Sequence, residues 1–110
     1  MKRLPDIKEP QKPLCYDPKR DKFILFDELV SGKEQIVPLE QLTREQIKKL
    51  VVERNLRGRD YTAQWGFGGP KYPRDAMLQE IIDETDVGKQ AIEAEISQLS
   101  DILRQIEENM

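Results

Sequence analysis

The sequence predicts a mainly helical α+β fold with a short β-hairpin, a capped helix, a long loop and a long, coiled-coil-like C-terminal amphipathic helix. Three observations carry this prediction. A capping signature opens residues 43–55, apolar residues recur at heptad spacing from Leu78 onward, and two β-favouring runs flank a turn at Gly32. With 110 residues and 37% apolar content, the chain is expected to form one small domain with a modest core.

Residues 1–21 are rich in proline, which is spaced among Lys, Asp and Gln. Proline lacks the backbone donor that helices and central strands require. We therefore expect an extended arm over residues 1–21, with the run Leu14-Cys15-Tyr16 as a candidate anchor. A small α+β domain over residues 22–84 and a heptad helix over residues 85–110 would follow it.

Residues 22–29 and 35–39 are predicted to pair as a β-hairpin. Phe23-Ile24-Leu25-Phe26 and Ile36-Val37 favour strands, and Gly32 between them can take the positive φ of a turn. An isolated two-stranded hairpin is marginal in water. We therefore expect it to pack on helices or to extend a partner's sheet.

Residues 43–55 carry the strongest helix signal. Thr43 is a favoured N-cap, and Gln46 three residues later completes a capping box. Apolar residues then follow at helical spacing and predict an inward-facing stripe. The helix is expected to end at Asn55 or Gly58.

Residues 74–110 are helical by pattern. The heptad seam contains two polar residues, Thr85 and Lys89, so one long helix and two helices broken near residues 86–88 both remain open. The seam has two uses: packing on the domain's own core, or pairing with a second helix. Thin apolar content elsewhere favours self-association or a helix partner. The predicted oligomerisation residues are Ile92, Ile96, Leu99, Leu103 and Ile106.

Composition excludes several function classes. The chain has no histidine and one cysteine, so the commonest general base and the usual zinc ligand sets are missing. We predict a non-enzymatic protein with no metal and no cofactor.

A lone cysteine fits a reducing compartment, and no apolar run reaches membrane-spanning length or forms a signal peptide. We therefore predict a cytoplasmic protein with no membrane partner.

Residues 54–74 concentrate cations, rings and glycine. The wider segment 44–74 carries eight Lys/Arg and three Asp/Glu, whereas residues 75–110 carry two and ten. Cations and rings together suit a surface that holds phosphates and stacks on bases. For Trp65, a core position competes with a stacking role. The predicted nucleic-acid-binding residues are Lys48, Lys49, Arg54, Arg57, Arg59, Tyr61, Trp65, Lys71, Tyr72 and Arg74.

Residues 42–84 resemble the SAP-type helix–extended-loop–helix module. In that family two short helices bracket a loop, and the resemblance implies that the basic surface around the loop binds DNA or RNA. The link over residues 56–73 is longer and more aromatic than is usual in the family. The matching positions are Leu42, Ile47, Leu50, Leu56, Gly58, Lys71, Asp75, Leu78, Ile81 and Ile82.

Two functions follow as hypotheses. The first is a nucleic-acid-binding protein that uses the basic aromatic loop and self-associates through its C-terminal helix. The alternative is an assembly or adaptor subunit of a larger protein complex. In that case residues 56–73 dock in a partner's groove, with Trp65 and either Arg57 or Arg59 as anchors.

Overall fold

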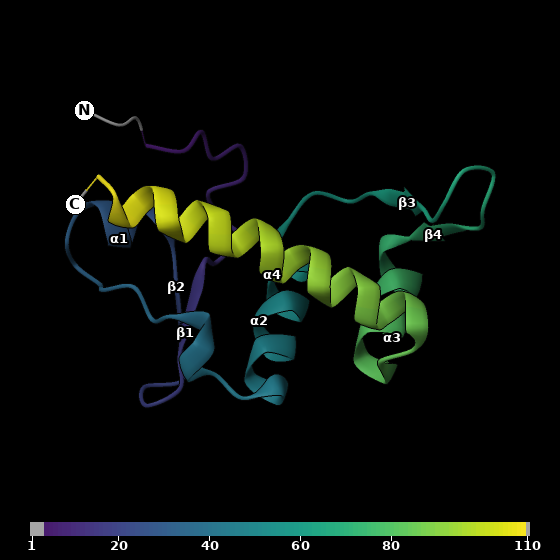
Figure 1. Ribbon diagram of the computed structural model, residues 1–110, viewed down its shortest axis with the longest axis horizontal. Helices are drawn as coiled ribbons and strands as arrows, with labels where there is room; N and C mark the ends of the chain where they lie inside the picture. Colours follow the sequence, from purple (N-terminus) through teal and green to yellow (C-terminus); the bar gives the residue numbers. More distant parts are fainter. Residues whose placement is uncertain (1–3, 110) are drawn as a thin grey trace.

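The computed structural model of the protein describes residues 4–109 and confirms the mainly helical α+β class. Its long final helix runs along most of the molecule and lies across the other elements (Figure 1). In chain order the elements are β1 (Cys15–Asp17), β2 (Lys22–Ile24), α1 (Phe26–Val30), the 3-10 turn η1 (Leu39–Gln41), α2 (Arg44–Arg57), β3 (Thr62–Gln64), β4 (Lys71–Pro73), α3 (Arg74–Asp83) and α4 (Asp86–Glu107).

The strands form two separate antiparallel hairpins, β1–β2 and β3–β4. The predicted pairing of residues 22–29 with residues 35–39 is wrong, because β2 pairs with β1 in the register Cys15↔Ile24. The first predicted strand ends at Ile24, because residues 26–30 form α1, whose first turn is capped when the Leu25 N–H donates to Glu28 Oε1 at 3.0 Å. Residues 35–39, the second predicted strand, form no strand. Gly32 does take a positive φ of 83°, but it follows the end of α1.

The proline-rich segment is part of the domain from Pro13 onward. Leu14, Cys15 and Tyr16 are buried, as expected of anchors, and the Leu14 N–H donates to the Ile24 carbonyl at 2.8 Å. The extended arm is therefore shorter than predicted, because residues 15–17 form strand β1. Residues 1–3 of the predicted arm lie outside the described residues.

Helix α2 confirms the capping prediction. The Gln46 N–H donates to Thr43 Oγ1 at 3.2 Å, and the Thr43 N–H donates to Gln46 Oε1 at 2.9 Å. The helix ends at Arg57 with Gly58 as its C-cap, which is one of the two expected ends. The predicted inward-facing apolar stripe is also confirmed, since Leu50 and Val51 are fully buried.

The C-terminal region consists of two helices. Glu84 takes a left-handed conformation (φ 50°) after α3, and Thr85 caps α4 by accepting from the Gly88 N–H at 3.1 Å. A Cβ at Gly88 would lie 1.8 Å from the Glu80 carbonyl oxygen. Only glycine permits this close approach of the two helices.

Two apolar clusters share α4. The first contains Leu14, Ile24, Leu50 and Leu99; the second contains Val51, Met77, Ile81 and Ile92. Ile47 and Ile96 pack against both clusters and join them.

The heptad seam is therefore used within the chain. Ile92, Leu99 and Ile106 are fully buried, Leu103 is nearly so, and Ile96 is half-buried. This corrects the expected use of these five residues as a self-association surface, because their side chains already form the core. Across residues 4–109, no helix combines the length and apolar character needed to cross a membrane.

Candidate functional site

The β3–β4 hairpin projects from the end of the molecule beside α3 (Figure 1). Its tip closes when the Trp65 N–H donates to the Pro70 carbonyl at 3.1 Å. Gly66 and Gly68 have φ values of 78° and 72°, a region that L side chains rarely adopt. Between them Phe67 is fully exposed, with a relative exposure of 111%.

The base of the hairpin is fixed to the body. The Trp65 indole Nε1 donates to Gln90 Oε1 at 2.7 Å, and the Arg74 N–H donates to the Tyr61 carbonyl at 2.9 Å. Tyr61, Trp65 and Tyr72 are half-buried against the second cluster. Trp65 therefore holds the hairpin on α4 and has only part of its ring in solvent.

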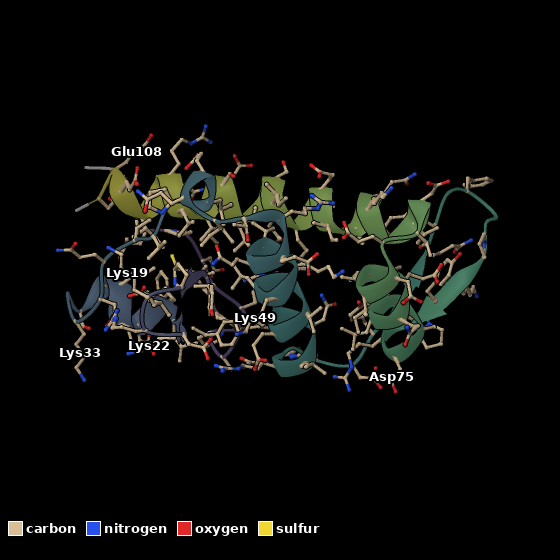
Figure 2. The ribbon with its side chains drawn as sticks, turned by 90° about the horizontal axis from the view of Figure 1, so that it is seen from below. Lys19, Lys22, Lys33, Lys49, Asp75 and Glu108 are labelled. Carbon is tan, nitrogen blue, oxygen red and sulfur yellow. The ribbon has the colours of Figure 1, made fainter. Side chains whose placement is uncertain are left out.

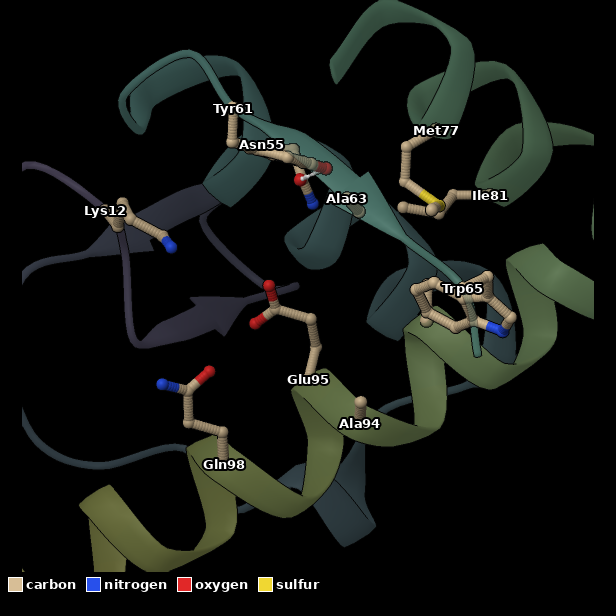
Figure 3. A pocket seen from close by; sticks show the side chains of 11 residues that line it. Lys12, Asn55, Tyr61, Ala63, Trp65, Met77, Ile81, Ala94, Glu95 and Gln98 are labelled. Carbon is tan, nitrogen blue, oxygen red and sulfur yellow. Dashed lines mark hydrogen bonds between the residues drawn. The ribbon is translucent and has the colours of Figure 1, made fainter. Parts of the chain in front are cut away.

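A pocket of about 220 Å³ opens where the hairpin meets α3 and α4 (Figure 3). Ala63, Met77 and Ile81 form apolar walls, and Trp65 stands at one side. Glu95 and Gln98 of α4 point toward the opening, and Lys12 lies across from them. The full lining is Lys12, Asn55, Tyr61, Ala63, Trp65, Met77, Ile81, Ala91, Ala94, Glu95 and Gln98.

Several polar side chains that line this pocket already have partners. The Tyr61 hydroxyl donates to Asn55 Oδ1 at 2.5 Å. Burial raises the pKa of Tyr61, and the charge of nearby Glu95 raises it further. The pocket is thus mainly an apolar cavity with a polar rim.

Arg54 is a structural residue, which differs from its predicted role as a phosphate contact. Its side chain is 3% exposed, and its Nε lies 3.0 Å from Glu95 Oε2. Its Nη1 also donates to the Pro13 carbonyl at 2.9 Å. Arg54 therefore joins α2 to α4 and to the segment that leads into β1, and it is closed to an outside phosphate.

Four other predicted cations also have carboxylate neighbours. Lys48 Nζ lies 3.4 Å from Glu84 Oε2, Lys49 Nζ lies 2.7 Å from Asp21 Oδ1, and Arg57 Nε lies 2.7 Å from Glu53 Oε2. Arg74 Nε lies 3.9 Å from one carboxylate oxygen each of Asp60 and Asp75. A phosphate would have to compete with these carboxylates, which weakens the positive field expected from sequence.

Two predicted cations remain without ion pairs within the part of the chain that the structure describes. Arg59 precedes β3 and Lys71 begins β4, and both are exposed. The other lysines are dispersed: Figure 2 shows Lys19, Lys22 and Lys33 toward one end, Lys49 near the middle and the β3–β4 hairpin at the opposite end. Of the predicted set, Lys49 therefore lies over Tyr16 near the middle of the molecule, apart from Lys71 and Tyr72 on β4.

Sequence reasoning missed the pocket and its supports. Asn55, Gln90 and Glu95 carry no motif, and their partners become visible only in the fold. The exposed ring of Phe67 had a readable signal, since it stands between Gly66 and Gly68-Gly69. Among residues 4–109, no three acidic or cysteine side chains converge as metal ligands would.

Comparisons with family models, curated proteins and solved structures find no match for this chain. The SAP-type resemblance of residues 42–84 therefore stays a prediction. Its implied binding surface has to be weighed on the geometry of α2, the β3–β4 hairpin and α3 alone.

Proposed function

We propose that the protein is a non-enzymatic adaptor subunit that binds another protein through the tip of its β3–β4 hairpin. The observation that carries the proposal is the fully exposed ring of Phe67 on a projecting tip. Phe67 is the largest side chain between Trp65 and Lys71, so it would enter a partner's pocket first. Burying such a ring contributes about 1.5–3 kcal/mol.

The fixed base of the hairpin supports this function. Hydrogen bonds from Trp65 to Gln90 and from Arg74 to Tyr61 position the tip before binding. A pre-positioned segment loses less conformational entropy on association. Aromatic anchors held in this way are frequent among the residues that dominate protein interfaces.

Nucleic-acid binding is the second candidate, and one observation favours it. Arg59 and Lys71, the two predicted cations without ion pairs within residues 4–109, lie on the segment that carries Phe67. A ring beside exposed cations can bind single-stranded DNA or RNA by stacking and phosphate contact. The neutralised cations of α2 make this the weaker proposal, since they leave few phosphates to be contacted.

Site-specific photo-crosslinking separates the two functions. A benzophenone side chain at position 67 should crosslink to protein in an extract of the source cells, with a yield that nuclease treatment does not change. The same group at exposed Lys33, which Figure 2 places toward the other end of the molecule, is the matched control. Equal yields from the two positions would contradict the proposal, and nuclease-sensitive crosslinks from position 67 would favour the second candidate.

We also place the proposed adaptor in the cytoplasm. Cys15 is a free thiol in the core, and burial raises its pKa to about 11. The thiol therefore stays protonated at neutral pH. A reduced lone cysteine is typical of reducing compartments.

A further inference from the structure

We infer that the protein bound by the hairpin tip is a second copy of this chain, with Phe67 of each copy seated in the pocket beneath the other copy's hairpin. This inference rests on the proposed function and names its partner. It joins two features that the fold leaves unmatched: an uncovered ring and an open apolar pocket on the same chain.

The pocket has the size for a phenyl ring. Its volume is about 220 Å³. An apolar cavity of about 150 Å³ is enough to bind benzene. The pocket therefore accepts the ring of Phe67 and leaves room for the backbone that carries it.

The pocket also has suitable chemistry. Met77 and Ile81 offer a thioether and a branched alkyl group to the ring, and sulfur–aromatic contacts are favourable. The nearby polar groups of Tyr61 and Asn55 bond to each other, and Glu95 is bonded to Arg54. A ring that enters the pocket therefore breaks none of these hydrogen bonds and leaves none of these polar groups without a partner.

Charge supports a second copy as the occupant. Beside the tip, Lys71 is exposed and has no ion pair within residues 4–109. On the pocket side, Glu95 lies at the opening with its carboxylate paired to Arg54, and α4 (Asp86–Glu107) carries five acids and two bases. Lys12, the cation at the rim, is itself within 3.8 Å of Glu9. An exposed cation beside the tip thus meets a helix that carries more acids than bases.

Symmetry makes the arrangement reciprocal. Trp65 lines the pocket and lies only two residues before Phe67, so pocket and tip are neighbours on one chain. When two such chains meet about a two-fold axis, each contact is made twice. The two docking events then reinforce each other, as linked binding sites do.

The first test measures self-association of the full chain by sedimentation equilibrium. The native chain should form dimers. Phe67→Ala and Ala94→Trp, which fills the pocket from an exposed position, should each raise the dissociation constant at least about 30-fold. Val30→Ala removes an exposed apolar side chain from α1 and should leave the dimer unchanged. Equal thermal midpoints for all four chains, measured at a concentration at which each is monomeric, would show that folding is intact.

The second test mixes the two defective chains. ¹⁵N-labelled Phe67→Ala keeps an open pocket, and unlabelled Ala94→Trp keeps its tip. Adding the second chain should shift the Trp65 indole signal of the first, whereas adding unlabelled Phe67→Ala should not. An unshifted signal in both mixtures would contradict reciprocal docking.

A native chain that stays monomeric would overturn the inference. If position 67 still crosslinks to a different protein, the adaptor function survives and only the choice of partner fails. If Phe67→Ala shifts the Trp65 indole signal of a monomer, Phe67 occupies its own pocket, and the inference fails for that reason.

Discussion

The two hairpins of this protein have the same strand lengths and opposite surroundings. β1–β2 carries Cys15 and Ile24, both fully buried, whereas no residue of β3 or β4 is buried. Both hairpins are antiparallel pairs of three-residue strands. Strand length and pairing therefore do not decide whether such an element stabilises the fold; the side chains packed on it do.

The ends of the hairpins differ in the same way. Around β1–β2, Arg20 donates to Glu34 at 2.8 Å, and Lys22 donates to Glu28 at 2.8 Å. The tip of β3–β4 is closed by backbone hydrogen bonds and leaves Phe67 uncovered. We interpret the first hairpin as part of the core and the second as a presented surface.

The largest expected effect comes from truncating the buried hairpin. Ile24→Ala should lower the free energy of unfolding by about 3 kcal/mol, because it opens a cavity beneath α2 and α4. Gln64→Ala, on an exposed position of β3, should change it by less than about 0.5 kcal/mol. Urea denaturation of both variants measures the difference, and similar losses would remove the distinction between the hairpins.

The buried ion pair should give a comparable or slightly smaller effect. Arg54→Met should lower the free energy of unfolding by about 3 kcal/mol, near the low end for a broken buried pair, since Glu95 keeps some access to water. Arg59→Met removes an exposed arginine beside the presented hairpin and should change it by less than about 0.5 kcal/mol. Guanidinium denaturation of both variants measures the two changes in the free energy of unfolding. An Arg54→Met variant as stable as the native chain would mean that this pair does not stabilise the packing of α2 on α4.

Acid should destabilise the first hairpin at its ion pairs. The hydrogen bond from Arg20 lowers the pKa of Glu34 below its ordinary value of 4.5, and the hydrogen bond from Lys22 does the same for Glu28. A carboxylate with a lowered pKa stabilises the fold above its ordinary pKa, and this stability is lost as the pH falls through the folded-state value.

Thermal unfolding between pH 7 and about pH 3 measures this loss. The midpoint should hold above about pH 5 and fall below it. Glu34→Gln should start lower at pH 7 and converge with the native chain in acid, whereas Lys71→Gln should follow the native curve. Parallel curves for Glu34→Gln and the native chain would exclude Glu34 as a contributor.

Sequence signals were reliable where they were local. Thr43 and Gln46 lie three residues apart, so the start of α2 could be read directly. The partner of β2 could not be read from the sequence, because residues 15–17 and residues 35–39 both favour a strand. Glu28 caps α1 after β2, and β2 pairs with residues 15–17. The fold class survived this error, since a hairpin formed in either case.

The candidate site shows the same limit. Composition located the segment that carries Phe67, but the neutralising partners of Arg54 and Lys48 come from Glu95 and Glu84, remote in sequence. Heptad spacing identified the apolar face of α4 and could not tell that the chain's own core would cover it. Sequence patterns therefore identify charged or apolar side chains, and only the fold shows which other side chains contact them.

The most direct test of the presented hairpin is a paired measurement on Phe67→Ser. At a concentration at which the native chain is monomeric, we predict a free energy of unfolding within about 0.5 kcal/mol of the native chain, because Phe67 packs on nothing in the described structure. In the same preparations, proteins recovered from an extract on the immobilised chain should fall to background when quantified by mass spectrometry. Lower stability with undiminished recovery would contradict the account, because Phe67 would then be a structural residue and not the binding one.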